Sequence, residues 1–204
     1  MALKSTFKAD LKKERQLFPL LDRMYTLHLK HYRFERISAY DQQLKGIDVV
    51  FTHKTTGEKY SIDEKAQLDY INDDLPTFAF EIEYQKKELV REGWLFDTAK
   101  KTDFYALVTA IYEDSPNTFT SCKITLVNRK KLLAFLASKG ITRQSLDQVI
   151  KKHPGKSAKQ TLAQLHAKKQ GYLYFSNLQK AEKPINLILK LDFLTVNGIA
   201  KRLV

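Results

Sequence analysis

Hydrophobic and polar residues follow two different periods along this chain. Between residues 9 and 31, apolar residues recur every three or four positions, as on one face of a helix: Leu17, Leu20, Leu21, Met24 and Leu27. This stripe predicts a helix over residues 9–31, with Pro19 as a local irregularity. Residues 77–84, in contrast, alternate strictly between polar and apolar, which is the period of a half-buried strand. The chain therefore combines helices with strands.

The same signals predict elements along the whole length. Strand-like segments occupy residues 32–40, 45–51, 59–67, 104–111, 119–127, 172–175 and 185–191, with a loop at 41–46. Helical patterns occupy residues 129–138, 143–152, 159–169 and 193–203. This order predicts an α/β fold in one domain over residues 1–204, with a mixed central sheet of about five or more strands flanked by helices and with C-terminal additions.

An aspartate inside an apolar strand is the most unusual position. Asp48 lies between Ile47 and Val49, where a carboxylate is unfavourable unless it has a partner. Residues 55–58 have turn composition, so the two strands around them form a predicted hairpin. Side-chain alternation divides the second strand into two faces: Ser61, Asp63 and Lys65 on one, and Tyr60, Ile62 and Glu64 on the other.

The predicted hairpin suits a divalent cation. If it places Asp48 beside Asp63, the two carboxylates and the backbone carbonyl of Glu64 are hard oxygen ligands for Mg²⁺, with Mn²⁺ as a substitute. Lys65 then meets a water or a phosphate oxygen. Gln67 continues the same face and is predicted to orient the attacking water or to contact a phosphate.

This pattern resembles the PD-(D/E)xK nuclease superfamily, in which an acid on one strand of a hairpin is followed by acid-x-lysine on the next. Asp48, Asp63 and Lys65 are the matching positions, and the likeness covers residues 10–112. Ile47 stands where the motif has proline. The resemblance implies a restriction-endonuclease-like core and a Mg²⁺-dependent nuclease, a hydrolase of phosphodiester bonds, with DNA as the expected substrate.

Further acids are candidate metal ligands. Several superfamily members carry an additional acid on the first helix, so the resemblance adds Glu14 and Asp22 as candidates. Glu81 and Glu83 share one face of the alternating segment 77–84, and one of them, first Glu81, is expected to join the site. The alternative is that these acids are solvated. Likewise, Asp48 and Asp63 can flank turns while Lys65 pairs with a neighbouring acid on a solvated sheet face.

Charge is distributed unevenly. Residues 123–204 carry 17 Lys and Arg against 3 Asp and Glu, whereas residues 1–122 carry 18 against 20. A basic C-terminal portion suits a nucleic-acid partner, although a solvated lysine-rich surface remains the alternative. The predicted contact residues surround the Pro154-Gly155 break or precede Asp48: Lys151, Lys152, Lys156, Lys159 and Gln43. Trp94 is a candidate for base stacking, against the more common position of tryptophan in a core.

Composition limits the remaining classes. No stretch approaches the ~20 apolar residues of a membrane span, and the first residues lack the apolar core of a secretory signal, so a cytoplasmic protein is expected. Cys122 is the only cysteine, which excludes an intramolecular disulfide. Two other classes stay open: a noncatalytic nucleic-acid-binding protein of the same fold, and an interaction protein with an acidic partner. A homodimer also stays open.

Overall fold

The computed structural model describes residues 7–86, 89–116, 118–153, 158–176 and 182–204. It has the predicted α/β class, with a mixed six-stranded sheet, an antiparallel five-stranded sheet and helices. The chain forms two compact units that alternate along the sequence. Residues 6–76, 99–129 and 195–204 form the unit with six strands, called here the six-strand unit. Residues 77–98 and 130–194 contribute the other, called the five-strand unit.

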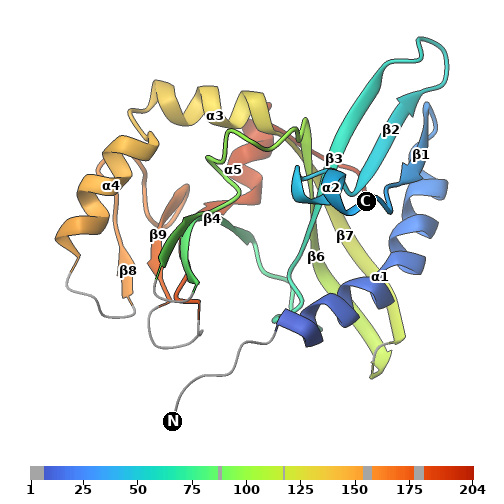
Figure 1. Ribbon diagram of the computed structural model, residues 1–204, viewed down its shortest axis with the longest axis horizontal. Coiled ribbons are helices and arrows are strands. Elements are labelled where there is room, and N and C mark those ends of the chain that lie inside the picture. Colours follow the sequence, from blue (N-terminus) through green and yellow to red (C-terminus); the bar gives the residue numbers. More distant parts are fainter. Residues whose placement is uncertain (1–6, 87–88, 117, 154–157, 177–181) are drawn as a thin grey trace. The chain divides into compact units, whose positions relative to one another are not determined.

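The sheet of the six-strand unit has the order β1-β2-β3-β6-β7-β11 (Figure 1). Neighbouring strands are antiparallel except for β3 and β6, which run parallel. The strands are β1 (Tyr32–Arg36), β2 (Val49–His53), β3 (Lys59–Ala66), β6 (Phe104–Ser115), β7 (Thr118–Asn128) and β11 (Ala200–Arg202).

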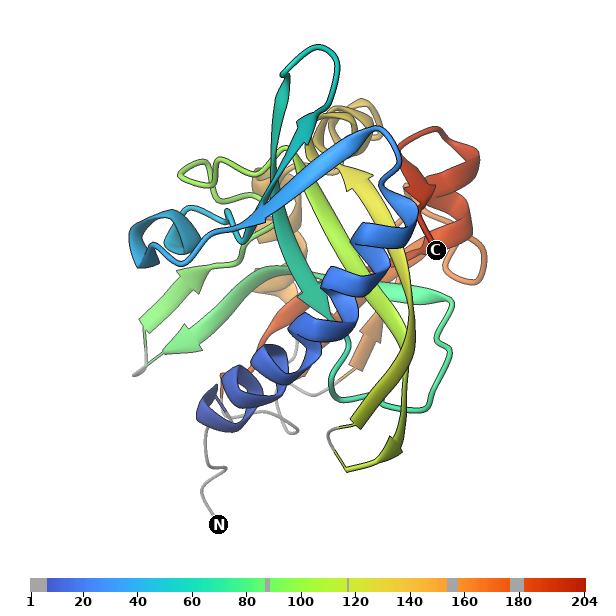
Figure 2. The ribbon, with the colours of Figure 1, turned by 90° about the vertical axis from the view of Figure 1, so that its right-hand side faces the viewer.

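One long helix covers a face of this sheet. In Figure 2, α1 (Phe7–His28) runs along the strands, and most of its predicted apolar stripe packs there. Leu17, Leu21 and Tyr25 pack with Val49 and Ile62 of the sheet in one hydrophobic core. The predicted stripe is wrong at its C-terminal end, because Leu27 is 59% exposed.

The five-strand unit has its own antiparallel sheet, in the order β5-β4-β10-β9-β8 (Figure 1). Its strands are β4 (Thr77–Lys86), β5 (Leu89–Glu92), β8 (Ala158–Gln160), β9 (Gly171–Phe175) and β10 (Ile185–Lys190). Its helices are α3 (Arg129–Ser138), α4 (Arg143–Lys152) and α5 (Leu191–Val196). Thr142 caps α4 in a reciprocal capping box with Ser145.

Three predicted elements are wrong. Residues 159–169 are not a helix, because residues 158–160 pair with β9 as β8 and the following residues form turns that bury Leu162 and Leu165. Two leucines three positions apart fit a helix face, but strand pairing overrides so short a signal. The terminal helix over 193–203 stops at Val196, since Gly198 has a φ of +65° and the chain continues as β11.

The third correction concerns the segment before Asp48. The strand predicted over 32–40 ends at Arg36, and the loop predicted at 41–46 contains α2 (Tyr40–Leu44), a short helix with no buried residue. Tertiary contacts fix this helix, which is too short to form by propensity alone. No described helix is long and apolar enough to cross a membrane.

Candidate functional site

The β2–β3 hairpin places Asp48 and Asp63 on the same face of the sheet. Asp48 immediately precedes β2, and its N–H donates to the carbonyl of Ile62 at 2.9 Å. Val49 pairs with Ile62 in the antiparallel register, so Asp48 lies opposite Asp63. Directly opposite residues of antiparallel strands project to the same side. The hairpin that the sequence predicts is therefore present, and it brings the two aspartates together.

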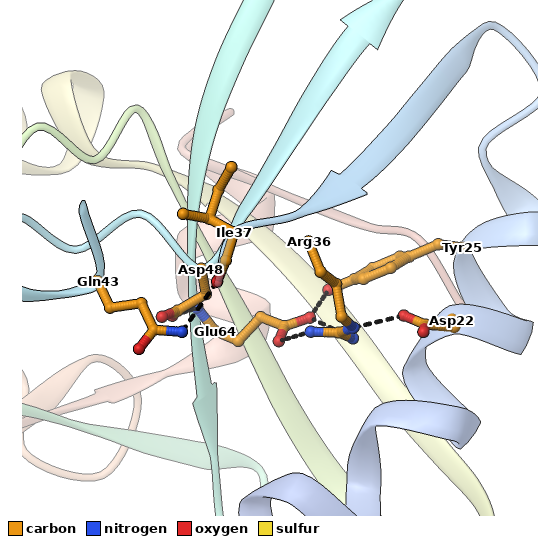
Figure 3. A network of polar contacts seen from close by, with 7 residues as sticks. All are labelled: Asp22, Tyr25, Arg36, Ile37, Gln43, Asp48 and Glu64. Carbon is orange, nitrogen blue, oxygen red and sulfur yellow. Dashed lines mark hydrogen bonds and ion pairs between the residues drawn. The ribbon is translucent and has the colours of Figure 1, made fainter. Parts of the chain in front are cut away.

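Backbone groups from three segments hold Asp48 in place. Its carbonyl accepts a hydrogen bond from the N–H of Ile37 at 2.8 Å, just after β1. Its Oδ2 atom accepts another from the N–H of Glu64 at 2.8 Å (Figure 3). The carbonyl of Ile37 in turn accepts from Nε2 of Gln43 at 2.9 Å. Asp48 is thus anchored to rigid strands, which positions a functional group accurately.

Asp63 is buried, with 1% of its surface exposed. Its Oδ1 atom forms an ion pair with Nζ of Lys65, two positions along β3. Its Oδ2 atom is also buried and has no donor in place among the described residues, while the Asp48 carboxyl group, when protonated, shares a side-chain hydrogen bond with Asp63. A buried carboxylate oxygen without a donor is unfavourable and rare in folded proteins. The side chain of Lys65, 27% exposed, connects this buried pair to solvent.

Charge around the pair shifts two pKa values. Burial, followed by the negative charge of Asp63, raises the pKa of Asp48 to about 7, against the opposing effects of Lys65 and the Glu64 N–H. For Lys65, burial favours a lower pKa, but the two aspartates outweigh it and the pKa is raised. Lys65 therefore keeps its proton near neutral pH, and Asp48 exchanges its proton in that range.

The other face of β3 carries a separate polar network (Figure 3). Glu64 accepts hydrogen bonds from Tyr25 Oη at 2.7 Å and from Arg36 Nη1 at 2.7 Å. The Arg36 guanidinium also donates through Nε to Asp22 at 2.6 Å. Glu64 thus faces α1, away from the side of Asp63 and Lys65, which confirms the predicted alternation along β3.

The remaining acidic candidates lie on different elements. Asp22 of α1 forms an ion pair with Arg36, and Arg36 also pairs with Glu64. These contacts lie on the face of β3 opposite to Asp63. Glu14 is exposed on α1. Glu81 belongs to β4, in the sheet of the five-strand unit, where its carbonyl accepts from the N–H of Leu95. None of these positions joins the strand pair that holds the two aspartates.

Glu83, on the same strand as Glu81, pairs with Arg143 at the start of α4. This ion pair lies within the five-strand unit. Gln67 follows β3 directly, is half-buried, and its N–H donates to the carbonyl of Val108 at 3.0 Å. Gln67 therefore lies just beyond the strand that carries Asp63 and Lys65.

The predicted nucleic-acid contacts also belong to the five-strand unit, apart from Gln43. Lys151 and Lys152 are exposed in the last turn of α4. Lys159 is exposed on β8, and its Nζ atom lies 4.0 Å from the centroid of the Tyr172 ring. Lys156 and the Pro154-Gly155 break lie outside the described residues. Trp94 is partly buried, with its ring 5.4 Å from that of Phe80.

A second segment braces the site, which the sequence did not indicate. Three consecutive carbonyls, of residues 44–46, each accept a hydrogen bond from one of three consecutive residues, Lys100, Lys101 and Thr102. The donors are Lys100 Nζ at 2.8 Å, the Lys101 N–H at 2.8 Å and Thr102 Oγ1 at 2.8 Å. Gly46 has a φ of +74°, and a Cβ there would lie 3.2 Å from Asp63 Oδ2 and 2.5 Å from Thr102 Oγ1. The glycine thus allows the loop to pass close to the carboxylate.

Tyr105 and Arg129 form another unpredicted contact beside Asp63. Tyr105 pairs with Asp63 across the parallel β3–β6 register and is fully buried. Its hydroxyl accepts from Nε of Arg129 at 2.9 Å. Burial raises the pKa of Tyr105 to about 12 against the effect of Arg129. Only the register of a parallel pairing could have revealed this neighbour, and parallel partners are distant in sequence.

The donor set fits one hard divalent cation. Two carboxylates with a buried oxygen lacking a donor are suitable ligands for Mg²⁺, which is often bound through one or two carboxylates and several waters. Within the described ranges, no three His, Cys, Asp or Glu side chains gather as a metal-binding group. Any cation held here therefore relies on Asp48, Asp63, backbone carbonyls and water.

Comparison of the chain with protein-family models, with curated proteins and with solved structures gave no significant match.

Proposed function

We propose that this protein is a divalent-metal-dependent nuclease that hydrolyses phosphodiester bonds, with DNA as the expected substrate. The observation that carries the proposal is the pairing of Asp48 with the buried Asp63 beside protonated Lys65. The two carboxylates can hold a metal ion, and the positively charged Lys65 beside them can contact a phosphate at the same place.

Each of the three residues has a distinct role in this mechanism. Asp48 and Asp63 hold Mg²⁺, or Mn²⁺ in its place, and Asp48 binds it better once it has lost its proton. When bound, the cation supplies Lewis-acid chemistry, because it polarises the scissile phosphate and makes water more acidic. Lys65 stabilises the negative charge that develops on the phosphate oxygens, since its raised pKa makes it a poor base.

The reaction is a hydrolysis. A water oxygen forms a bond to phosphorus while the bond from phosphorus to one sugar oxygen breaks, in line with the attack. The attacking water gives up one proton to solvent, and the leaving sugar oxygen takes one up. Gln67, which follows the strand of Asp63 and Lys65, orients the water or contacts a phosphate oxygen.

Two further features support the proposal. The leading helix, the hairpin with its acids and the mixed sheet agree with the restriction-endonuclease-like core that the motif implies. Residues 77–98 and 130–194 of the five-strand unit carry 16 Lys and Arg against 8 Asp and Glu, whereas the six-strand unit carries 18 against 15. The excess positive charge therefore lies mainly in the unit without the carboxylate pair, which suits binding of a polyanion.

That basic unit also favours the second candidate, a noncatalytic nucleic-acid-binding protein of the same fold. Incubation of pure protein with supercoiled, linear, single-stranded and branched DNA and with RNA, in Mg²⁺, Mn²⁺ or EDTA, separates the two. The nuclease proposal requires cleavage that depends on metal and is lost in Asp63→Asn. Glu35→Gln, at an exposed position of β1, is the matched control and keeps full cleavage. Binding without cleavage of any substrate would favour the noncatalytic protein.

A further inference from the structure

Helix α2 presents an apolar ridge that the proposed mechanism does not use. Tyr40 and Leu44 are its first and last residues, 73% and 58% exposed. They are separated by four positions, so they lie on the same face of the helix. No residue of α2 is buried. The Tyr40–Leu44 ridge is therefore an exposed apolar surface on a helix that has no core side of its own.

The ridge is nevertheless held firmly. Gln43 ties α2 to the carbonyl of Ile37, and Lys100 donates to the carbonyl of Leu44. The next two carbonyls are bound by the Lys101 N–H and the Thr102 hydroxyl. A rigid support lowers the entropic cost of using an exposed side chain for binding.

Its position places the ridge next to the carboxylate pair. A Cβ at Gly46 would be 3.2 Å from Asp63 Oδ2. Leu44 lies two Cα steps before Gly46, and Tyr40 one helical turn before Leu44, so the ridge extends to about 14 Å from Gly46. At about 3.4 Å per stacked nucleotide, this distance corresponds to a few nucleotides.

Charges beside the ridge favour an anionic partner. Lys45 and Lys101 are exposed, and Lys100 lies at the C-terminal end of α2. Asp41 is also exposed and lies 3.8 Å from Lys45 Nζ. Exposed lysines near an exposed aromatic side chain are components of a surface that binds unpaired bases and their phosphates.

We infer that the Tyr40–Leu44 ridge stacks an unpaired base of the nucleic acid a few nucleotides from the scissile phosphate, which makes a single-stranded segment the preferred substrate. This inference rests on the proposed nuclease function and specifies its substrate class. A single strand is favoured over a duplex because stacking on a protein aromatic ring requires an exposed base face, which a closed duplex offers only at its ends.

The experiment measures binding without cleavage, in EDTA, by fluorescence anisotropy. Three fluorescent probes are compared: single-stranded DNA, single-stranded RNA of the same sequence, and the blunt-ended duplex of that DNA strand with its complement. Tyr40→Ala is expected to weaken binding of the single strands about tenfold and of the duplex less than about twofold. Tyr40→Phe keeps the aromatic ring and is expected to bind like wild type. Tyr112→Ala, at another exposed tyrosine of the six-strand unit, is the matched control.

Several outcomes would overturn the inference. Equal loss on single strand and duplex would make Tyr40 a general contact, and unchanged binding would remove it from the interface. If light scattering shows a wild-type dimer that Tyr40→Ala dissociates, the ridge covers a second copy of the chain instead. Thermal melting checks that the variants fold, as expected because α2 buries no side chain.

Binding and cleavage are scored separately, so the two proposals fail in different ways. If single-strand binding depends on Tyr40 but no substrate is cleaved, the binding role of the ridge is supported and the nuclease function is refuted. If Tyr40→Ala cleaves with metal and prefers single strands as wild type does, the nuclease function is supported and the binding role of the ridge is refuted.

Discussion

Replacing Asp48 by asparagine should make the metal-free protein more stable at pH 8. Asp48 has a pKa raised to about 7, because burial and Asp63 both disfavour its charged form. Asparagine has nearly the same shape and can still accept the hydrogen bond from the Glu64 N–H, but it carries no charge. The variant therefore removes the repulsion and keeps the backbone contact.

The size of the effect follows from proton linkage. A carboxyl group with a pKa of 3.8 when unfolded and about 7 when folded stabilises the folded state below pH 4. This stabilisation is lost as the pH rises to about 7, and above that both states are ionised. Between pH 5 and pH 8 the wild-type free energy of unfolding should fall by up to about 2–3 kcal/mol from this group. Solvent that reaches the half-buried carboxyl group makes this an upper limit.

Thermal melting in EDTA, from pH 5 to pH 8, measures this difference. A change of about 2 kcal/mol corresponds to a shift of roughly 4–8 °C for a chain of this size. Wild type should lose that stability towards pH 8, while Asp48→Asn should show a flatter profile and a higher melting temperature at pH 8. Asp73→Asn, at an exposed aspartate, controls for the loss of one negative charge. A parallel pH profile for wild type and Asp48→Asn would refute the reasoning.

The remaining predictions concern metal, chemistry and charge. Mn²⁺ at about 100 times its Kd should stabilise wild type by about 2.7 kcal/mol and leave an Asp48→Asn, Asp63→Asn double variant unchanged; calorimetric titration that finds equal binding would remove the site. Lys65→Ala should lower single-turnover cleavage about 100- to 1000-fold and keep metal and nucleic-acid affinity, whereas Lys59→Ala, at an exposed lysine of β3, should not. Asp63→Asn should be at least as damaging as Lys65→Ala and Glu64→Gln much milder; the reverse order for the two acids would contradict the face assignment. The last variant replaces four lysines by glutamine: Lys151, Lys152, Lys156 and Lys159. It should bind unrelated oligonucleotides more weakly and to the same extent, and the slope of log affinity against log salt concentration should fall by up to about 4 units. An unchanged slope would identify these lysines as solvated surface.

The part of the site that depends on alternation was predictable from the sequence. A strand has a fixed side-chain period of two, so the assignment of Asp63 and Lys65 to one face and Glu64 to the other needed only the strand itself. The short turn between the two strands then fixed the register that sets Asp48, just before β2, opposite Asp63. Local rules of this kind also located α3 and α4.

Contacts between distant segments were not predictable in the same way. The bonds from Lys100 and Thr102 to the loop before Asp48 join residues 56 positions apart. No periodic pattern or turn in the sequence predicts the parallel pairing of Asp63 with Tyr105. Short elements failed for a related reason, since β8 and α2 form through tertiary contacts and not through propensity. Likewise, the amino-acid composition did not indicate that segments of the two units alternate along the chain.

The unfavourable electrostatics of the pair are an argument for a ligand and against a purely structural role. Asp63 keeps one buried oxygen without a donor among the described residues, and Asp48 is placed beside it at the cost of a raised pKa. A structural aspartate would relieve both effects by turning its side chain towards solvent or a donor. Here hydrogen bonds with Ile37 and Ile62 fix the backbone of Asp48, and the N–H of Glu64 holds its side chain through Oδ2. Two carboxylates held together against their repulsion support the proposed cation site, and the pH profile of Asp48→Asn tests that repulsion.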